Sequence, residues 1–379
     1  MTAPANRQRA DAERPALPAG GARAGAGRTR IALFLAACLA AAASAGCGSA
    51  EQSVSPVADA MHVDAGGAKL YIEVRGDHAD APLLVWLHGG PGGAERPLFR
   101  YFNDGLERRF LVVYYDQRGA GLSFDPEEPL SSINIAQHVA DLSRIVSELR
   151  ERYRRGHVLL VGHSWGAVLG MLYAKAHPET VAGLICVAPA VSFSEQQRRE
   201  FAYDVEEAAK HNDEAALREL RAIGPPPYET SGPMLQLENI TARYRGVEYQ
   251  ARSHAAIVVE GVLRGLVTPW EIFRIIKGSH RSLEAMHQEL MAFDLRREVS
   301  SLDIPIAFFL GRHDHHSDAS LAAEYFAMLR APRKEIVWFE DSAHNVPFDE
   351  PELFNARIAE VSRRLRFFRD ELHQPPASP

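Results

Sequence analysis

The sequence predicts an α/β fold with a mostly parallel sheet, helices on both faces of that sheet and an inserted helical segment. From about residue 60 onward, short apolar runs typical of buried strands alternate with segments of helical periodicity. The alternation stops between residues 191 and 295 and resumes after them. A chain of 379 residues that is 46% hydrophobic is long enough for one large α/β domain with such an insertion.

The first part of the predicted core covers residues 61–190. Apolar runs predict strands at 69–76, 82–89, 109–116, 157–161 and 181–189. Helical periodicity or composition predicts helices between these strands at 95–108, 133–153 and 167–176. Either Ser132 or Asn134 can cap the helix at 133–153, because both side chains accept hydrogen bonds from free helix N–H groups.

The insertion, residues 191–295, consists of amphipathic helical pieces without a clear strand. We expect breaks at "GPPPY" (224–228) and at Gly278. Inside an α/β domain, a helical segment of this kind is expected to cover the carboxyl ends of the strands as a cap.

The second part of the core is predicted over residues 296–370, followed by a flexible tail at 371–379. The expected elements are a strand at 304–311, a helix at 318–329, a strand at 334–340 and a helix at 350–369.

The first sixty residues differ in kind from the rest. Residues 1–30 are rich in Ala, Arg, Pro and Gly and are expected to be disordered. Arg28 and Arg30 then precede "IALFLAACLAAAASAGC", a positive region followed by an apolar one and small residues, which is typical of an export signal. The apolar stretch is short for a membrane span, which needs about 20 apolar residues. We therefore expect residues 1–47 to direct export from a bacterial cytoplasm.

The end of this signal resembles a lipoprotein cleavage site. Small residues lead directly into Cys47, which would become the lipidated N-terminus, with residues 48–60 as a tether. Cys38 is a second candidate for lipidation, and an ordinary secretory signal or an uncleaved anchor is the alternative. The expected location is thus the membrane surface, or the periplasm or exterior.

Charge and cysteine content exclude other classes. The net charge is −7 and there is no basic run, so no nucleic-acid partner is expected. Three cysteines, Cys38, Cys47 and Cys186, cannot form a disulfide framework.

The stretch Gly162-His163-Ser164-Trp165-Gly166 lies where a predicted strand turns directly into a predicted helix. The pattern G-x-S-x-G at such a corner is the nucleophile elbow, in which glycines avoid clashes and the serine Oγ is lifted clear of the sheet. The plainer interpretation is a glycine-flanked turn with a solvent-facing serine. The flanking strand and helix favour a nucleophilic Ser164, with His163 packed away from it.

A serine nucleophile needs a base and an orienting acid, and in this arrangement the chain order is Ser, acid, His. Asp314 follows the strand at 304–311, and His344 follows the strand at 334–340. Asp318 is a second candidate for the acid, but it is better placed to cap the next helix. The cluster "HDHH" (313–316) matches no known metal-ligand spacing, so neither a metal nor another cofactor is implied.

Donors for an oxyanion are predicted in "HGGPGG" (88–93). Its glycines allow close approach of the backbone to a substrate, whereas Pro91 has no N–H to donate. The expected pair of donors is the N–H of Gly90 and the N–H of Trp165, the residue after the nucleophile.

Five motifs, "HGGPGG", "YYDQRGAGLS", "VGHSWGAVLG", "GRHD" and "SAH", together resemble the proline iminopeptidase family of α/β-hydrolases over roughly 60–190 and 296–365. The resemblance implies an α/β-hydrolase fold and a serine aminopeptidase that removes an N-terminal proline or another residue. It implies structural roles for Asp116 and Arg118, which brace the floor of the active site. In the loop at 88–93, we expect His88, Gly89 and Pro91 to have structural roles in the motif.

The resemblance also implies that acidic residues of the cap hold the free amine of a small or short-peptide substrate. Glu260 and Glu271 are candidates, and Trp270 could form a pocket wall, although each carboxylate taken alone fits ordinary helix-surface charge. Two alternatives remain open. The same machinery could cleave esters, lactones or other amides, or the chain could be a lipid-tethered binding protein without turnover.

Overall fold

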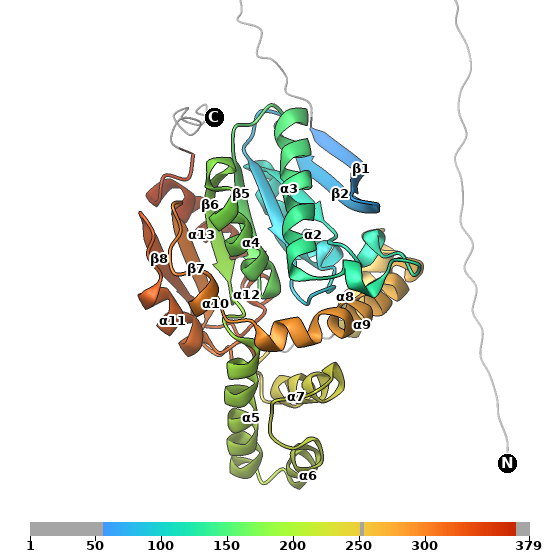
Figure 1. Ribbon diagram of the computed structural model, residues 1–379, viewed down its shortest axis with the longest axis vertical. Coiled ribbons are helices and arrows are strands. Elements are labelled where there is room, and N and C mark those ends of the chain that lie inside the picture. The colour runs from blue at the N-terminus through green and yellow to red at the C-terminus, as the bar shows by residue number, and fades with distance from the viewer. Residues whose placement is uncertain (1–55, 251–253, 369–379) are drawn as a thin grey trace, which may run out of the picture. The chain divides into compact units, whose positions relative to one another are not determined.

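The computed structural model describes residues 56–250 and 254–368, which contain an eight-stranded sheet in the order β1-β2-β4-β3-β5-β6-β7-β8 (Figure 1). The strands are β1 (Val57–Ala65), β2 (Ala68–Gly76), β3 (Leu83–Leu87), β4 (Leu111–Tyr115), β5 (Val158–His163), β6 (Val181–Val187), β7 (Ile306–Gly311) and β8 (Lys334–Phe339). Only β2 pairs antiparallel with its neighbours, and the other pairs are parallel. The predicted α/β fold with a mostly parallel sheet is confirmed.

The central strands are apolar on both faces because helices cover both sides of the sheet. Along β5, Val158 and Leu160 pack into one hydrophobic cluster, whereas Leu159 and Val161 pack into the other. This alternation follows from the two-residue period of a strand. A strand buried on both faces therefore appears in the sequence as a continuous apolar run.

Two sets of helices form the outer layers. The first cluster takes side chains from α3 (Ile135–Arg152), α4 (Trp165–Ala176) and α11 (Ala319–Met328), and the second takes them from α2 (Arg96–Asn103) and α13 (Pro351–Arg364). Asn134, not Ser132, caps α3 by accepting the Gln137 N–H at 2.9 Å. Asp318, which the sequence offered as a second candidate for the acid or as a helix cap, caps α11.

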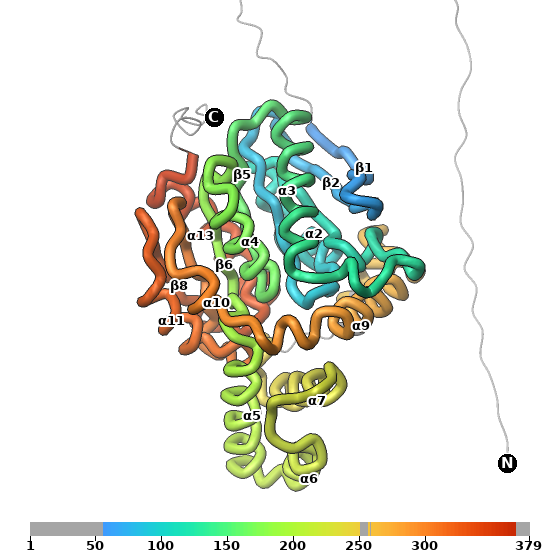
Figure 2. The backbone as a smooth tube through the Cα atoms, viewed as in Figure 1, coloured from blue at the N-terminus to red at the C-terminus, as the bar shows by residue number. Residues whose placement is uncertain are grey.

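The cap consists of helices throughout the part of residues 191–295 that the structure describes. It contains α5 (Phe193–Lys210), α6 (Glu214–Ile223), α7 (Ser231–Arg243), α8 (His254–Leu263) and α9 (Pro269–Ala292), and the short α10 (Leu295–Glu298) follows. Helices α5, α6 and α7 share a small hydrophobic cluster of their own. Figure 2 shows α5 continuing from the end of β6 and α9 running across the same end of the sheet. A bridge between Ser192 and Asp294 joins the two points where the cap leaves and rejoins the core.

Three details differ from the sequence-based prediction. Residues 57–60 belong to β1 and not to a tether. Most of this edge strand alternates between half-buried and exposed residues, which gives only a weak apolar signal in the sequence. Gly278 does not break a helix, since α9 runs through it. A glycine is needed at this position because a Cβ would collide with the Gly119 carbonyl of the adjacent loop. The last predicted helix, 350–369, corresponds to α13, which ends earlier, at Arg364, and the short α12 (Val346–Asp349) precedes it.

The predictions for residues 1–47, including Cys38 and Cys47, and for the tail at 371–379 lie outside the described residues, as does most of the predicted tether. Within residues 56–250 and 254–368, none of the helices has the length and apolar character needed to cross a membrane.

Candidate active site

Ser164 lies at the sharp turn between β5 and α4. Its backbone adopts φ 52° and ψ −116°, a conformation that is costly for a residue with a side chain. The turn is this tight because Gly166 packs directly against β3, where an added Cβ would collide with the Leu87 carbonyl oxygen. The sequence G-x-S-x-G therefore folds as an elbow that places Ser164 in the wall of a cavity of about 270 Å³.

Asp314 and His344, which follow β7 and β8, meet beside this cavity. His344 Nδ1 lies 3.2 Å from Asp314 Oδ2, and the Ser317 hydroxyl donates to the same oxygen at 2.5 Å. The backbone N–H groups of His316 and Ser317 donate to Asp314 Oδ1 at 3.0 and 2.9 Å. The structure thus brings the predicted acid and base together, and His344 lines the same cavity as Ser164.

This environment fixes the charge of the acid. Burial would raise the pKa of Asp314, but the nearby His344 and the hydrogen bonds from His344 and Ser317 outweigh it and lower the pKa to about 2. An ionised Asp314 accepts the N–H at His344 Nδ1, which leaves Nε2 of the neutral ring as the proton acceptor. The arrangement can therefore take a proton from a serine hydroxyl.

The pH dependence of activity follows from the surroundings of His344. Burial lowers its pKa below the ordinary 6.5; Asp314 opposes this lowering, and positive charge on His316 and His163 adds to it. Because neutral His344 is the required base, kcat/KM should fall only as the pH drops through a value below 6.5. His316→Gln removes a positive neighbour and should shift this acid limb to higher pH. An acid limb above 6.5, or a shift to lower pH in the variant, would contradict this assignment.

The loop after β3 supplies one of the two predicted oxyanion donors. Gly89 and Gly90 line the cavity with Ser164, and the Gly90 N–H has no hydrogen-bond partner in the described part of the chain. The Ser164 N–H is already bound to the Val187 carbonyl at 2.9 Å, whereas Trp165 is the first residue of α4, where helix N–H groups lack intrahelical partners. The N–H groups of Gly90 and Trp165 are therefore free to donate, as the predicted pair of oxyanion donors requires.

Gly90→Ala should disrupt this donor. Gly90 has φ 109°, and a Cβ would collide with the backbone nitrogens of Gly92 and Gly93. Loss of one oxyanion donor lowers kcat by about 100-fold or more. The matched control is Gly67→Ala, which also has a positive φ of 93° but open space around its Cβ. Equal activity of the two variants would argue against a role for the Gly90 loop.

The floor of the site is a buried hydrogen-bond network that joins β3, β4 and α4. Gln117 donates its N–H to His88 Nε2 at 3.0 Å and accepts the Trp165 indole N–H at 2.9 Å. Asp116 accepts the Leu122 N–H at 2.8 Å, and Arg118 binds Asp141. These contacts agree with the structural roles that the resemblance implied for His88, Asp116 and Arg118.

His163 has a larger role than simple packing. Its Nδ1 lies 2.7 Å from Glu95 Oε1, and its Nε2 lies 3.1 Å from the His344 carbonyl oxygen. Both contacts favour the protonated form of the ring, in which both nitrogens donate. Burial would lower the pKa of His163, but Glu95 and the carbonyl raise it. His163 thus ties the residue before the nucleophile to the start of α2 and to the backbone of His344.

The histidines of "HDHH" attach the loop of Asp314 to the cap. His313 stacks on Tyr249 at 4.0 Å between ring centroids, and His315 stacks on Tyr203 at 3.8 Å. His316 Nδ1 lies 2.8 Å from Glu200 Oε1, an interaction that raises the pKa of His316 to about 10 against the effect of burial. Each of the three rings has a partner within the protein, which explains the cluster without a metal.

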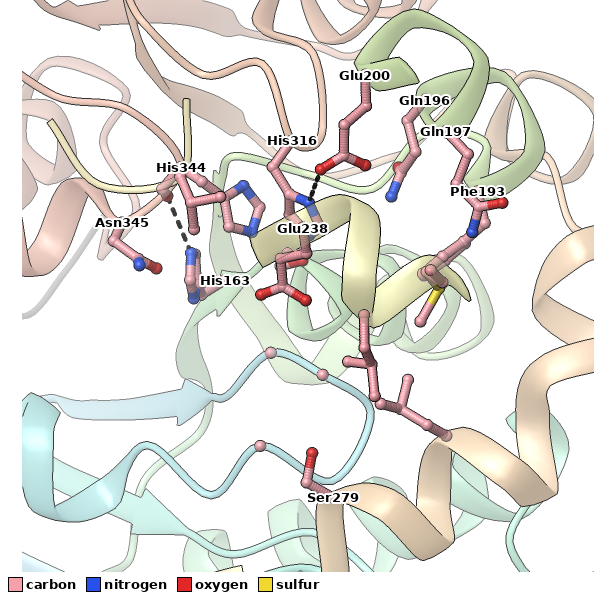
Figure 3. A pocket seen from close by; sticks show the side chains of 18 of the residues that line it. His163, Phe193, Gln196, Gln197, Glu200, Glu238, Ser279, His316, His344 and Asn345 are labelled. Atoms are coloured by element: carbon pink, nitrogen blue, oxygen red, sulfur yellow. Dashed lines mark hydrogen bonds and ion pairs between the residues drawn. The ribbon is translucent and has the colours of Figure 1, made fainter. Parts of the chain in front are cut away.

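The cap places two carboxylates in the wall of the cavity, Glu200 of α5 and Glu238 of α7 (Figure 3). Glu200 is buried and accepts from His316 and from the Thr241 hydroxyl through the same oxygen, Oε1. Glu238 has no hydrogen-bond or ion-pair partner among the residues that the structure describes. Sequence reasoning missed both residues.

The three cap residues that the sequence suggested lie elsewhere, so they are not part of this cavity. Glu260 accepts from the Tyr101 hydroxyl at 2.6 Å and pairs with Arg264. Glu271 pairs with Arg96 of the core, and Trp270 is 65% exposed. Glu260 lies on α8, and Trp270 and Glu271 lie in the first turn of α9, whereas the two carboxylates of the cavity wall lie on α5 and α7.

Comparison with known proteins agrees with the fold. Residues 82–218 match the model of the α/β hydrolase fold family. The probable aminopeptidase YbaC of Bacillus subtilis is 26% identical over 79% of this chain and 94% of its own length. A probable proline iminopeptidase of Streptomyces coelicolor is 40% identical over 31% of this chain and 36% of its own length.

Among solved structures, the proline iminopeptidase of Mycobacterium smegmatis is similar with a TM-score of 0.61 and 18% identity. This match covers 82% of the chain and all of that protein, and it supports the fold. The sheet order and the matched segment show an α/β-hydrolase fold, and the chain is similar in sequence to proline iminopeptidases and aminopeptidases.

Proposed function

We propose that this protein is a serine aminopeptidase that releases the N-terminal residue of a short peptide or amide through an acyl-enzyme. The observation that carries the proposal is the single cavity lined by Ser164, His344 and the unpartnered carboxylate of Glu238. A nucleophile, its base and a negative charge in the wall of the same cavity match a substrate with a free amine next to its scissile bond. The names of the relatives, a probable aminopeptidase and a probable proline iminopeptidase, support the same reading.

The residues act in two half-reactions. Ser164 Oγ attacks the carbonyl carbon while His344 takes its proton, and the amides of Gly90 and Trp165 bind the resulting oxyanion. When the C–N bond breaks, His344 returns the proton to the leaving amine, and Ser164 keeps the acyl group as an ester. Water then attacks this ester with His344 as base again, which frees the amino acid and restores the serine. Asp314 orients His344 throughout.

Glu238 is the group best placed to bind the substrate ammonium. Glu238 makes no hydrogen bond or ion pair in the described chain, whereas Glu200 is paired with His316. Glu200 lines the same cavity, and its second oxygen, which has no hydrogen-bond partner among the described residues, adds a further acceptor for the ammonium. This subsite takes the place of the one sought at Glu260 and Glu271.

The alternative is an esterase or lactonase with the same serine. The Glu200–His316 ion pair favours this esterase or lactonase alternative, because the two charges cancel and this part of the cavity wall would not attract a substrate ammonium. The two functions differ in whether a free amine is required. In the remaining alternative, a binding protein without turnover, Ser164 would not react with any acyl or phosphoryl group.

A fluorophosphonate probe tests whether the serine is a nucleophile at all. The wild-type protein should be labelled covalently at Ser164, as located by mass spectrometry of its peptides. His344→Ala should label much more slowly because it lacks the base, whereas Ser301→Ala, at an exposed position, should label normally. A wild-type protein that stays unlabelled would refute the serine mechanism and leave the binding-protein alternative.

We further propose that the protein is exported and is anchored to a membrane through a lipid on Cys47. The support is the arrangement of a positive region, an apolar region and small residues before Cys47 in the sequence. Incorporation of labelled palmitate in a bacterial host should be lost in Cys47→Ser and retained in Cys38→Ser. The reverse pattern would move the anchor to Cys38, and labelling of neither form would favour plain secretion.

A further inference from the structure

A second cavity adjoins the active site. It has a volume of about 160 Å³, and Glu95 and Asn345 line both it and the larger cavity that contains Ser164. Its apolar wall is formed by Leu98, Phe102, Ile257 and Phe348. Cavities that enclose a whole drug-sized ligand measure about 300–1,000 Å³, so this one has room for a single side chain.

The position of the second cavity relative to His344 indicates which part of a substrate reaches it. In Figure 3, Asn345 lies on one side of His344, and Glu200 and Gln196 lie on the other side. If the substrate ammonium binds at Glu238 and Glu200, the chain beyond the scissile bond must extend away from them. The leaving amine must also start within reach of His344, which protonates it. Asn345 follows His344 directly, so the leaving side of the substrate passes the shared wall of the two cavities.

We propose that the second cavity is the subsite for the residue after the scissile bond and that it selects a bulky apolar side chain there. The inference rests on the proposed aminopeptidase function and adds a substrate preference to it. Its physical basis is that burying an apolar side chain against Leu98, Phe102, Ile257 and Phe348 is favourable, whereas a charged one would lose its hydration.

Hydrogen bonds hold the walls of this subsite in place. Asn345 donates its side-chain N–H to Glu248 at 3.1 Å and its backbone N–H to the Val247 carbonyl at 3.2 Å. Asp349 accepts the backbone N–H groups of Tyr249 and Gln250 at 3.1 and 2.9 Å. The segment after α7 is therefore fixed to the loop that carries His344 and to α12. A cavity with such walls is formed before the substrate binds, which is what selectivity for one class of side chain requires.

The test uses the full mature chain with dipeptide amides that carry proline or alanine first and glycine, leucine, phenylalanine or aspartate second. We expect kcat/KM for leucine and phenylalanine to exceed that for glycine by about 10-fold or more, and aspartate to be the poorest. Leu98→Trp fills the cavity and should bring the leucine-to-glycine ratio close to one. Met328→Trp, on the exposed surface of α11, is the matched control and should keep the ratio.

The outcomes separate this inference from the function on which it rests. If all dipeptides are cleaved at similar rates, the second cavity is not a subsite, while the aminopeptidase function stands. If neither glycine nor leucine dipeptides are cleaved but a nitrophenyl ester is, both proposals are wrong. The wild-type series decides between these outcomes even if Leu98→Trp fails to fold.

Discussion

Ser164→Ala is expected to abolish turnover of every substrate and to leave the fold intact. Removal of the nucleophile from a serine hydrolase lowers kcat by about 10⁴-fold or more, because no other group can form the acyl-enzyme. The substitution deletes only one oxygen atom from a side chain that is 8% exposed and sits in the cavity wall. Alanine accepts the positive φ of the elbow no worse than serine does, since both carry a Cβ.

Turnover of a nitrophenyl ester and thermal unfolding measure the two parts of this prediction. The melting temperature should stay within a few degrees of wild type, and Ser301→Ala should match wild type in both measurements. Residual ester hydrolysis near the wild-type rate would mean that another group performs the chemistry, and the elbow would then be structural only.

Glu238→Gln is expected to separate amine recognition from catalysis. The variant keeps the shape of the side chain but loses the charge that would pair with the substrate ammonium. Removal of one partner of a close charge pair costs about 2–5 kcal/mol, so kcat/KM for an alanyl or prolyl nitroanilide should fall about 30-fold or more. Hydrolysis of a short nitrophenyl ester, which has no ammonium, should change little.

The matched control for this variant is Glu206→Gln, an exposed glutamate on α5 outside the cavity. It removes the same net charge from the cap, so it reports any long-range electrostatic effect. Equal losses in the two variants, or an equal loss on amine and ester substrates in Glu238→Gln, would refute the assigned ammonium site.

The core of the site could be predicted because each of its residues follows a strand that is recognisable in the sequence as an apolar run. Continuous apolar runs mark β5, β7 and β8, and the carboxyl ends of parallel strands meet at one edge of a sheet. Ser164, Asp314 and His344 therefore had to lie near each other once the strands were found. Strand β1 was missed because its first six residues alternate between half-buried and exposed, so it has no continuous apolar run.

The cap residues could not be found in the same way, because a helix in the sequence does not reveal which cavity it faces. Glu260 and Glu271 were chosen by type alone, and tertiary contacts with Tyr101 and Arg96 decide their roles. One signal was present in α5, where Gln196, Gln197 and Glu200 occupy the buried face begun by Phe193. Polar residues at the core-facing positions of an amphipathic helix indicate a polar cavity beneath it.

The role of His163 shows a second limit of sequence reasoning. From the sequence, a histidine beside a nucleophile is predicted to be packed in the core, but its charge depends on the groups that its two ring nitrogens contact. Glu95 and the His344 carbonyl come from segments 68 and 181 residues away in the chain. No local pattern encodes such a contact.

The most direct test of the account compares one peptide with its N-acetylated form. The substrate is a short peptide that begins with alanine or proline, and mass spectrometry follows release of the first residue by the mature chain, with Ser164→Ala as the blank. An aminopeptidase with this site should remove a single N-terminal residue from the free peptide and cleave the acetylated one at least about 30-fold more slowly, because only the free peptide carries the ammonium that Glu238 binds. Equal cleavage of both forms, or cleavage of neither while an ester is hydrolysed, would contradict an aminopeptidase.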